Sequence, residues 1–513
     1  MNVATHVGTR PAWVVSFVLV AVGAVLVGAG RAPTPPAAAE AYHYDFNAEC
    51  AAAYRTILDL RLAEGRLQLR ELRRREPGNL VPVWLEDYAD FFEVYISEDE
   101  AVFERLEEAY DARLDLLARG PRDSPYYRYA RANVMLHWAL ARLKFGEYVT
   151  TFREARRAYK LLDANLAAHP DFALTRKELG VLRAAVATVP DGYQWGVEFV
   201  TGMRGDLAGG KRLVEEVLAE QRRADSPFLQ ETTAIYAFLL LNLEREEDAA
   251  WSGIQGAGFD AERSLLGSFV LANIAMRTGR NDEAIRILSA RPHSPRYYPF
   301  PYLDFMLGVA LQRRLDDDAA VYLRSFVERK RRGNFIKEAY QKLAWEAALR
   351  DRRDDYFAEL AHAAARGDDV VGSDKNAQRE AELRVYPHPD LLRGRLLYDG
   401  GYFARADEAL ARVDERTLSG EQVIEYPYRA ARIAAARGRD ADAARLYKRA
   451  ISLGRESPAY FACKSAVELG HLAAAAGDAD GARAYYRLAL GMRPSEYGPG
   501  LHQQAKAGLA RLD

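Results

Sequence analysis

The sequence predicts an all-α fold, in which αα-hairpins form a solenoid in the C-terminal half and an irregular helical region precedes it. Three observations predict this class. The 513 residues are rich in Ala, Leu, Arg and Glu, which are strong helix formers. Val and Ile are scarce after the first thirty residues, so few stretches resemble strands. Glycines Gly401, Gly438 and Gly477 recur 37 and 39 residues apart, a period typical of two-helix repeats.

The composition narrows the class of function. Hydrophobic residues make up 49% of the chain, which is enough for a folded core and excludes a disordered one. Lys and Arg number 71 against 73 Asp and Glu, so the chain lacks the positive excess of a nucleic-acid-binding protein. Cys50 and Cys463 lie far apart, and the nine histidines are scattered. We therefore expect no disulfide, no metal site and no cofactor.

The N-terminal segment predicts export. Residues 12–30 carry no charge and lie between two arginines, and a Pro/Ala-rich stretch follows. This order is typical of a secretory signal, cleaved before Glu40 or Tyr42. The same run is long enough to span a bilayer, so an uncleaved anchor that tethers the chain to a membrane is the competing interpretation. Both place the protein in the periplasm or cell envelope, with the cleaved signal favoured, and both set residues 1–41 apart.

The clearest repeat unit lies near the C-terminus. Gly470 and Ala482 are small residues at the positions where two antiparallel helices must touch, and Gly477 falls at the turn between them. Pro494 ends the second helix. A similar unit surrounds Gly438, and weaker units extend back to about residue 264. We therefore predict a regular array over 264–513 and degenerate hairpins over 42–263.

Further helices are predicted in the N-terminal region from hydrophobic spacing and from breaks at Gly and Pro. They cover 47–76, 80–95, 98–119, 126–144, 147–168, 171–188 and 206–222. Four serines followed by proline also predict helix starts, because Ser is a good N-cap and Pro suits the first turn. These serines are Ser124, Ser226, Ser294 and Ser457.

The C-terminal units resemble the tetratricopeptide repeat (TPR) family. The match is specific in the last two units, covers roughly 265–513 well and covers 120–260 loosely. Other stretches (96–100, 124–127, 143–148 and 189–195) are similar to a group of exported bacterial TPR proteins, which implies an envelope setting but no activity. The family resemblance implies a scaffold that binds peptides or partner domains on a concave face. This implication concerns the fold and identifies no ligand.

The array positions that line the concave face of a TPR protein carry basic residues here. Arg395, Arg432 and His471 occupy equivalent positions in three units, with Lys464 at another such position in the last unit. Stacked repeats would align them into a basic ladder that suits a carboxylate or an acidic peptide. Tyr428, with Leu391 and Val467, is predicted to add an apolar surface. The competing interpretation is a set of solvated charges, some of them paired with Glu425 or Glu468.

A phosphate-loop pattern occurs once, over residues 205–212, but its context does not suit a nucleotide site. The pattern GxxxxGK is present, yet Arg212 stands where a Ser or Thr hydroxyl must hold magnesium. No run of parallel strands surrounds it. The sequence therefore predicts a glycine-rich turn that leads into the helix over 206–222.

We predict an exported TPR scaffold that binds a protein or peptide, without catalytic activity and without nucleic acid. One alternative is an envelope enzyme or carbohydrate-binding protein with a pocket between the helical halves, lined by carboxylates and aromatic residues near 126–129 or 190–205. A second alternative is an accessory subunit of a secretion or surface-assembly machine, which differs from the scaffold only in its partner.

Overall fold

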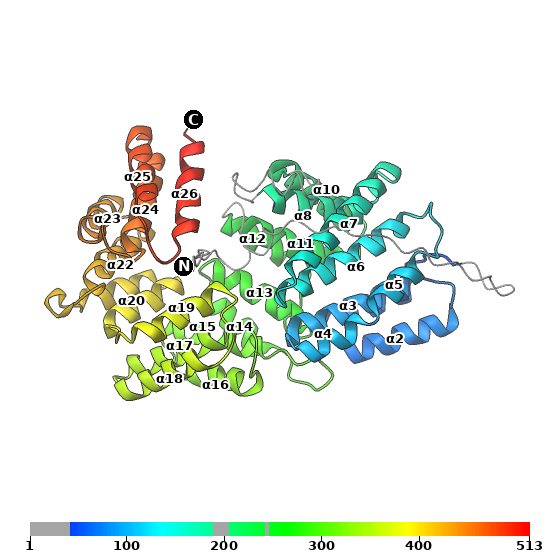
Figure 1. The fold of residues 1–513 in the computed structure, drawn as a ribbon, viewed down its shortest axis with the longest axis horizontal. Helices are drawn as coiled ribbons and strands as arrows, with labels where there is room; N and C mark the ends of the chain where they lie inside the picture. The colour runs from blue at the N-terminus through cyan, green and yellow to red at the C-terminus, as the bar shows by residue number, and fades with distance from the viewer. Residues whose placement is uncertain (1–41, 188–204, 242–245, 513) are drawn as a thin grey trace, which may run out of the picture. The chain divides into compact units, whose positions relative to one another are not determined.

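The computed structural model describes residues 42–187, 205–241 and 246–512 (Figure 1). The export segment 12–30 and the motif 189–195 lie outside these stretches. Within them no strand forms, and the only pairing of extended backbone is the isolated bridge between His43 and Asn79. None of the helices in these stretches is long and apolar enough to cross a membrane. The all-α prediction is confirmed for the described chain.

The described chain groups into two compact units. The first unit holds residues 42–278 and 286–300, and the second holds 279–285 and 301–512. The sequence predicted a boundary at 263/264 from where the repeats become regular. The two compact units are defined by packing and do not test that boundary, so it stays a prediction. Helix α14 (Asn281–Ala290) begins in the second unit and ends in the first.

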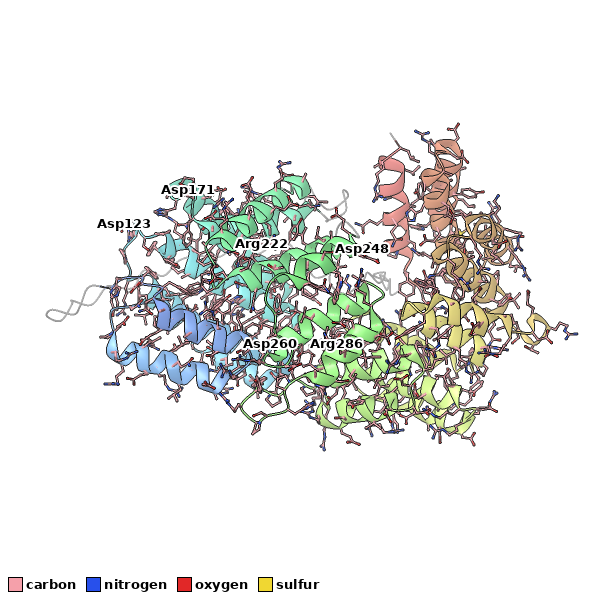
Figure 2. The ribbon with its side chains drawn as sticks, turned by 180° about the vertical axis from the view of Figure 1, so that it is seen from behind. Asp123, Asp171, Arg222, Asp248, Asp260 and Arg286 are labelled. Carbon is pink, nitrogen blue, oxygen red and sulfur yellow. The ribbon has the colours of Figure 1, made fainter. Side chains whose placement is uncertain are left out.

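The first unit consists of helical pairs, among which α6–α7 and α8–α10 are packed most extensively. Its helices are α1 (Ala48–Leu58), α2 (Leu62–Arg75), α3 (Val81–Ser97), α4 (Glu100–Glu107), α5 (Tyr110–Leu117), α6 (Pro125–Lys144), α7 (Tyr148–Ala168), α8 (Ala173–Ala187), α10 (Leu207–Arg223), α11 (Leu229–Leu239), α12 (Glu247–Gln255) and α13 (Leu265–Arg277). Figure 2 labels Arg222, in the last turn of α10, and Asp248, in the first turn of α12. A positive charge in the last turn of a helix and a negative charge in the first turn both interact favourably with the helix dipole.

The second unit is a run of five αα-hairpins with two extra helices. The hairpins are α15–α16 (Tyr302–Arg314, Ala319–Arg329), α17–α18 (Ile336–Leu349, Arg353–Ala365), α20–α21 (Pro389–Asp399, Phe403–Ala411), α22–α23 (Gln422–Ala436, Asp440–Gly454) and α24–α25 (Phe461–Ala475, Ala479–Gly491). Helix α19 (Gly372–Leu383) packs on α17 and α18, and α26 (Gly498–Ala510) packs on α24 and α25. The predicted αα-hairpin fold is confirmed for this unit, and the predicted bounds of the array, 264–513, stay a prediction.

The turn glycines and small contact residues act as predicted. Gly401, Gly438 and Gly477 have φ of 84°, 71° and 79°, a left-handed conformation that glycine adopts at little cost. A Cβ on Gly470 would lie 2.4 Å from a ring carbon of Tyr486 on the partner helix. The two helices of this hairpin can therefore approach closely only because residue 470 has no side chain.

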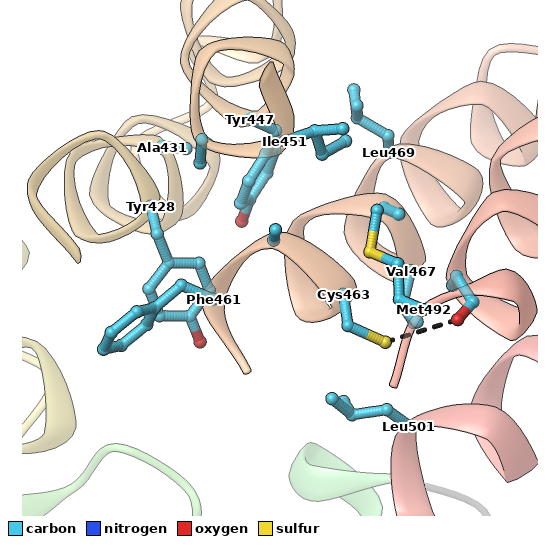
Figure 3. Close-up of a cluster of buried hydrophobic side chains, with 14 of the residues drawn as sticks. Tyr428, Ala431, Tyr447, Ile451, Phe461, Cys463, Val467, Leu469, Met492 and Leu501 are labelled. Carbon is cyan, nitrogen blue, oxygen red and sulfur yellow. Dashed lines mark hydrogen bonds between the residues drawn. The ribbon is translucent and has the colours of Figure 1, made fainter. Parts of the chain in front are cut away.

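One core cluster joins the last two hairpins and α26 (Figure 3). Tyr428 and Phe461 meet at a ring-centroid distance of 5.3 Å, and the Sγ of Cys463 lies 3.5 Å from the carbonyl oxygen of Ala489. Cys463 is a buried free thiol, as is Cys50 in the first unit. The cluster continues without a break from one hairpin to the next, as expected of stacked repeats.

The single helix predicted over 47–76 is wrong, because the chain breaks between α1 and α2. Leu60 has a φ of 62°, in the left-handed region that a non-glycine residue enters only at a cost of about 1–2 kcal/mol. Two tertiary contacts offset that cost. The Leu60 side chain is fully buried, and its carbonyl accepts a hydrogen bond of 2.7 Å from the Tyr298 amide. The helix predicted over 98–119 is likewise two helices, α4 and α5.

The Ser-Pro prediction is confirmed at one site and wrong at three. Ser124 is the N-cap of α6, and its hydroxyl accepts a hydrogen bond from the Tyr126 amide. Ser226, Ser294 and Ser457 accept the same bond from the residue two positions on, but α11, α15 and α24 begin three to eight residues later. At Ser294 the delay follows from two further prolines, since the residue before a proline is disfavoured in helical conformation.

Candidate functional site

The first helices of successive hairpins contact one another in the second unit, α20 with α22 and α22 with α24. The predicted basic residues lie on these helices: Arg395 on α20, Arg432 on α22, and Lys464 and His471 on α24. The hairpin geometry therefore sets them in a row across three repeats. What distinguishes the four is the set of neighbours around each side chain.

Arg395 lies against an aromatic ring contributed by the preceding hairpin. Its guanidinium carbon is 4.4 Å from the ring centroid of Trp345 on α17, and the Lys342 ammonium is 3.8 Å from the same centroid. The indole Nε1 donates a hydrogen bond of 2.7 Å to Glu380 on α19, which fixes the ring. Cation–π attraction and the fixed ring hold the Arg395 head group in place.

Arg432 repeats the arrangement one hairpin further on. Its guanidinium carbon lies 4.0 Å from the ring centroid of Tyr398 on α20 and 5.7 Å from that of Tyr428 on its own helix. Its nearest carboxylate oxygen, on Asp399, is 3.9 Å away, beyond hydrogen-bond distance. The side chain is 27% exposed.

Both guanidinium groups keep their hydrogen-bond donors uncommitted. Within the described chain, Arg395 makes no hydrogen bond and no ion pair, and Arg432 makes only the long contact with Asp399. Burial opposes the charge of each, yet the neighbouring tyrosine phenols and, after them, Asp399 hold each guanidinium pKa above its usual value. A guanidinium has five N–H donors in a planar fork that matches a carboxylate. Aromatic rings therefore hold two charged guanidinium groups in place, and the N–H donors of both groups remain available to an anion.

Tyr460, at the N-cap of α24, completes this cluster. Its ring centroid lies 5.8 Å from that of Tyr428 and 4.8 Å from that of Tyr497, in the segment before α26. Burial raises its phenol pKa, so the ring stays neutral at physiological pH. We call the cluster the arginine site and define it by Trp345, Arg395, Tyr398, Tyr428, Arg432 and Tyr460.

Lys464 and His471 are committed to an internal partner. The Lys464 ammonium lies 2.6 Å from one carboxylate oxygen of Glu468, and the His471 Nδ1 lies 3.3 Å from the other. Burial alone would favour the neutral acid, but the hydrogen bond from His471 and the charge of Lys464 hold the Glu468 pKa well below its usual range. The pairing with Glu468, which was the competing interpretation of the sequence, is therefore present. Its carboxylate offsets the positive charge of Lys464 and His471.

The apolar surface expected at Leu391, Tyr428 and Val467 is wrong. These side chains are 2%, 2% and 0% exposed. Tyr428 and Val467 lie in the core cluster of the last two hairpins, and Leu391 lies in a second core cluster formed mainly by α20 and α21. Tyr428 takes part in the arginine site only as a buried ring, 5.7 Å from the Arg432 guanidinium carbon. Sequence reasoning missed Trp345, Tyr398 and Tyr460 as neighbours of the arginines. Tyr398 stands three positions after Arg395, a spacing that places both on one helical face and could have suggested it.

The first unit contains a different polar cluster, which is internal. Lys177 is fully buried, with its ammonium 3.0 Å from Glu178 and 3.1 Å from Glu231. The Tyr54 hydroxyl donates a hydrogen bond of 2.9 Å to Glu231, which joins α1, α8 and the helix α11 that carries Glu231. Tyr129, in the aromatic stretch 126–129 considered for a carbohydrate-binding pocket, is also fully buried. Tyr54, Lys177 and the two carboxylates bind one another, and together with the Tyr129 ring they form part of the core.

The glycines of the phosphate-loop pattern serve helix packing. Asp206 is the N-cap of α10 and accepts a hydrogen bond of 2.8 Å from the Gly209 amide. A Cβ on Gly210 would lie 2.5 Å from the Gly180 carbonyl oxygen on α8, and one on Gly180 would lie 2.7 Å from the Gly210 carbonyl oxygen. The two glycines let α8 and α10 approach closely. The predicted helix over 206–222 is confirmed as α10, but Gly209 and Gly210 lie within it and not in a turn before it.

Comparison with known proteins gives only distant likenesses. No protein-family model matches the sequence, and no curated protein matches it. Among solved structures, yeast Tom70 is 13% identical, with 90% of this chain and 88% of that chain covered and a TM-score of 0.25. The TPR domain of P58(IPK) is 14% identical, with 82% of this chain and 97% of that chain covered and a TM-score of 0.21. The Cut9–Hcn1 hetero-tetramer of the APC/C is 9% identical, with 90% of this chain and 95% of that chain covered and a TM-score of 0.23.

Proposed function

We propose that this protein is a binding scaffold that holds an acidic peptide segment of a partner protein at the arginine site. The observation that carries the proposal is the state of Arg395 and Arg432, two guanidinium groups held on aromatic rings with their donors uncommitted. Charge-assisted bidentate bonds to carboxylates are the strongest contacts that such groups can form. No catalytic role is proposed.

Two features of the arginine site favour a peptide over a free small anion. The two arginines lie on successive repeats, so a ligand that uses both must extend along the row of helices. The rings of Tyr398 and Tyr460 supply apolar area beside the charges, which a peptide side chain can cover. A solenoid gains affinity by summing small contacts over several repeats.

The direct test is a titration with a fluorescein-labelled decapeptide that contains three Glu and one Tyr among Gly and Ser, read by fluorescence anisotropy. Replacing both Arg395 and Arg432 by Ala should weaken binding about tenfold or more, because a hydrogen bond to a charged group contributes about 1.5–3 kcal/mol. The matched control is Arg445→Ala on α23, where an arginine 70% exposed pairs with Asp442. Equal affinity in all three proteins would overturn the proposal.

We also propose that the scaffold works in the cell envelope. The support is the apolar run over 12–30 with its flanking arginines, read from the sequence alone. Mass spectrometry of the N-terminus of the mature protein, together with membrane fractionation, tests this setting. A protein that starts at residue 40 or 42 supports a cleaved signal, and an intact N-terminus in the membrane fraction supports an anchor. An intact N-terminus in the cytoplasmic fraction contradicts both.

A further inference from the structure

A short segment of the chain itself reaches the arginine site. Residues 495–497, between α25 and α26, have the sequence Ser-Glu-Tyr, and we call them the latch segment. The ring of Tyr497 lies edge-on to that of Tyr460, with centroids 4.8 Å apart and an interplanar angle of 72°. Tyr460 belongs to the arginine site, so the latch segment contacts that end of it.

The latch segment is held from two sides. On one side, the Ser495 amide and hydroxyl donate hydrogen bonds of 2.8 Å and 2.9 Å to the Pro458 carbonyl oxygen. On the other side, helix α19 holds it through side chains alone. The Arg379 guanidinium lies 2.9 Å from the Glu496 carboxylate and donates a hydrogen bond of 2.5 Å to the Ser495 hydroxyl. The Asn376 amide donates a hydrogen bond of 2.6 Å to the Tyr497 hydroxyl.

The contacts from α19 are of the kind that can be exchanged. Glu496 and Arg379 are 23% and 25% exposed, and Tyr497 is 42% exposed. Tyr497 also has a φ of 56°, in the left-handed region that a non-glycine residue adopts at a cost. A partly exposed ion pair and two side-chain hydrogen bonds contribute little against a competing partner of the same chemistry.

The latch segment also has the chemistry that the arginine site should select. Burial raises the pKa of Glu496 and of Tyr497, and the nearby Arg395 guanidinium acts against that rise in both cases. Arg395 is thus within electrostatic reach of a carboxylate and a phenol that come from the chain itself. An acidic residue followed by an aromatic one is the composition that open guanidinium donors beside tyrosine rings would bind.

We propose that the latch segment is an internal stand-in for the ligand, which occupies one end of the arginine site until a partner segment with an acidic residue next to an aromatic one displaces it. This inference rests on the proposed peptide-binding function and adds to it the class of peptide and a means of regulation. When the latch is closed in part of the molecules, only the molecules with an open latch can bind the ligand. The apparent affinity then equals the intrinsic affinity multiplied by the open fraction. Releasing the latch from α19 should therefore tighten binding.

The test uses the full chain and the labelled hexapeptide Pro-Ser-Glu-Tyr-Gly-Pro, the sequence of residues 494–499. Two variants release the latch: Glu496→Gln with Tyr497→Ala, and Arg379→Ala, which leaves the segment and α26 intact. Each should bind the hexapeptide about tenfold more tightly than the unmodified protein. Lys506→Ala, which removes one exposed charge from α26, is the control and should leave the affinity unchanged. A hexapeptide with Gln for Glu should bind more weakly to every variant.

The outcomes separate the inference from the proposed function. If the latch variants and the unmodified protein bind the hexapeptide equally, while Arg395→Ala with Arg432→Ala still weakens the decapeptide, the latch is wrong and the peptide site stands. If removing the two arginines leaves decapeptide binding unchanged, the proposed function is overturned and the latch with it. Should the Tyr497 substitution unfold α26, seen as lost ellipticity, the Arg379→Ala variant decides the question alone.

Discussion

The guanidinium carbon of Arg432 lies 4.0 Å from the ring centroid of Tyr398, a residue of the preceding hairpin. The contact crosses the boundary between two repeats, so the repeat stacking itself positions the arginine. Arg395 stands in the same relation to Trp345, one hairpin earlier. The proposed peptide binding depends on this arrangement, in which each ring of one repeat holds the cation of the next.

The Tyr398 ring should matter through its π face rather than its hydroxyl. Tyr398→Leu should weaken binding of the acidic decapeptide severalfold, because a cation–π contact of about 0.5–2 kcal/mol no longer positions Arg432. Tyr398→Phe keeps the face and should bind as the unmodified protein does. Anisotropy titrations of both variants give the answer, and a loss of equal size in the two would show that the ring face is not what positions Arg432.

Glu468 should contribute stability that depends on pH. Its folded pKa lies below the unfolded value of about 4.3, so the contribution is present at neutral pH and is lost as pH falls through the folded pKa. Glu468→Gln should lower the free energy of unfolding by roughly 1–2 kcal/mol at pH 7. Urea denaturation should show this difference from the unmodified protein shrinking as pH falls below about 4.3. A difference that stays constant with pH would contradict it, and the exposed Glu456→Gln is the control.

Gly470 should not tolerate a methyl group. Gly470→Ala places a Cβ 2.4 Å from the Tyr486 ring and should cost about 1–3 kcal/mol through forced repacking of the last hairpin. Gly491→Ala, at the end of α25 with nothing within 4 Å of its added Cβ, is the matched control. Thermal denaturation should show a lower midpoint for the first variant only. A similar midpoint for both would mean that the α24–α25 contact is looser than described.

The buried Lys177 should be essential to the first unit. Lys177→Met removes the cation that faces Glu178 and Glu231 and leaves both carboxylates without it, which should destabilise the unit by about 3–5 kcal/mol. Lys160→Met, on the exposed face of α7, should change the stability little. Hydrogen exchange of α8 and α11 reports the first unit directly. Unchanged protection in the Lys177 variant would show that the cluster adds no net stability.

The features that were predicted correctly are those that depend on residue spacing within a single hairpin. Gly401, Gly438 and Gly477 each form a left-handed turn, and the hairpins lie where the small residues placed them. Arg395 and Arg432 were identified because equivalent positions recur from unit to unit. Spacing of this kind is a property of one hairpin, so it can be read from one stretch of sequence.

Features that depend on distant contacts escaped prediction. The break at Leu60 follows from burial and from a hydrogen bond with Tyr298, far along the chain. Trp345 belongs to one of the weaker repeat units, and it reaches Arg395 only because its hairpin stacks against the next one. The latch segment contacts α19 through two polar side chains, Asn376 and Arg379. No pattern in the neighbouring sequence indicates this contact.

The most direct test of the central claim is charge reversal at the arginine site. Anisotropy titrations would compare the acidic decapeptide with a matched one carrying Lys for Glu, on the unmodified protein and on Arg395→Glu with Arg432→Glu. The unmodified protein should prefer the acidic peptide about tenfold or more, and the double variant should prefer the basic one, because the sign of the fixed charges sets the choice of ligand. A double variant that still prefers the acidic peptide to the same extent would contradict acidic-peptide binding at the arginine site.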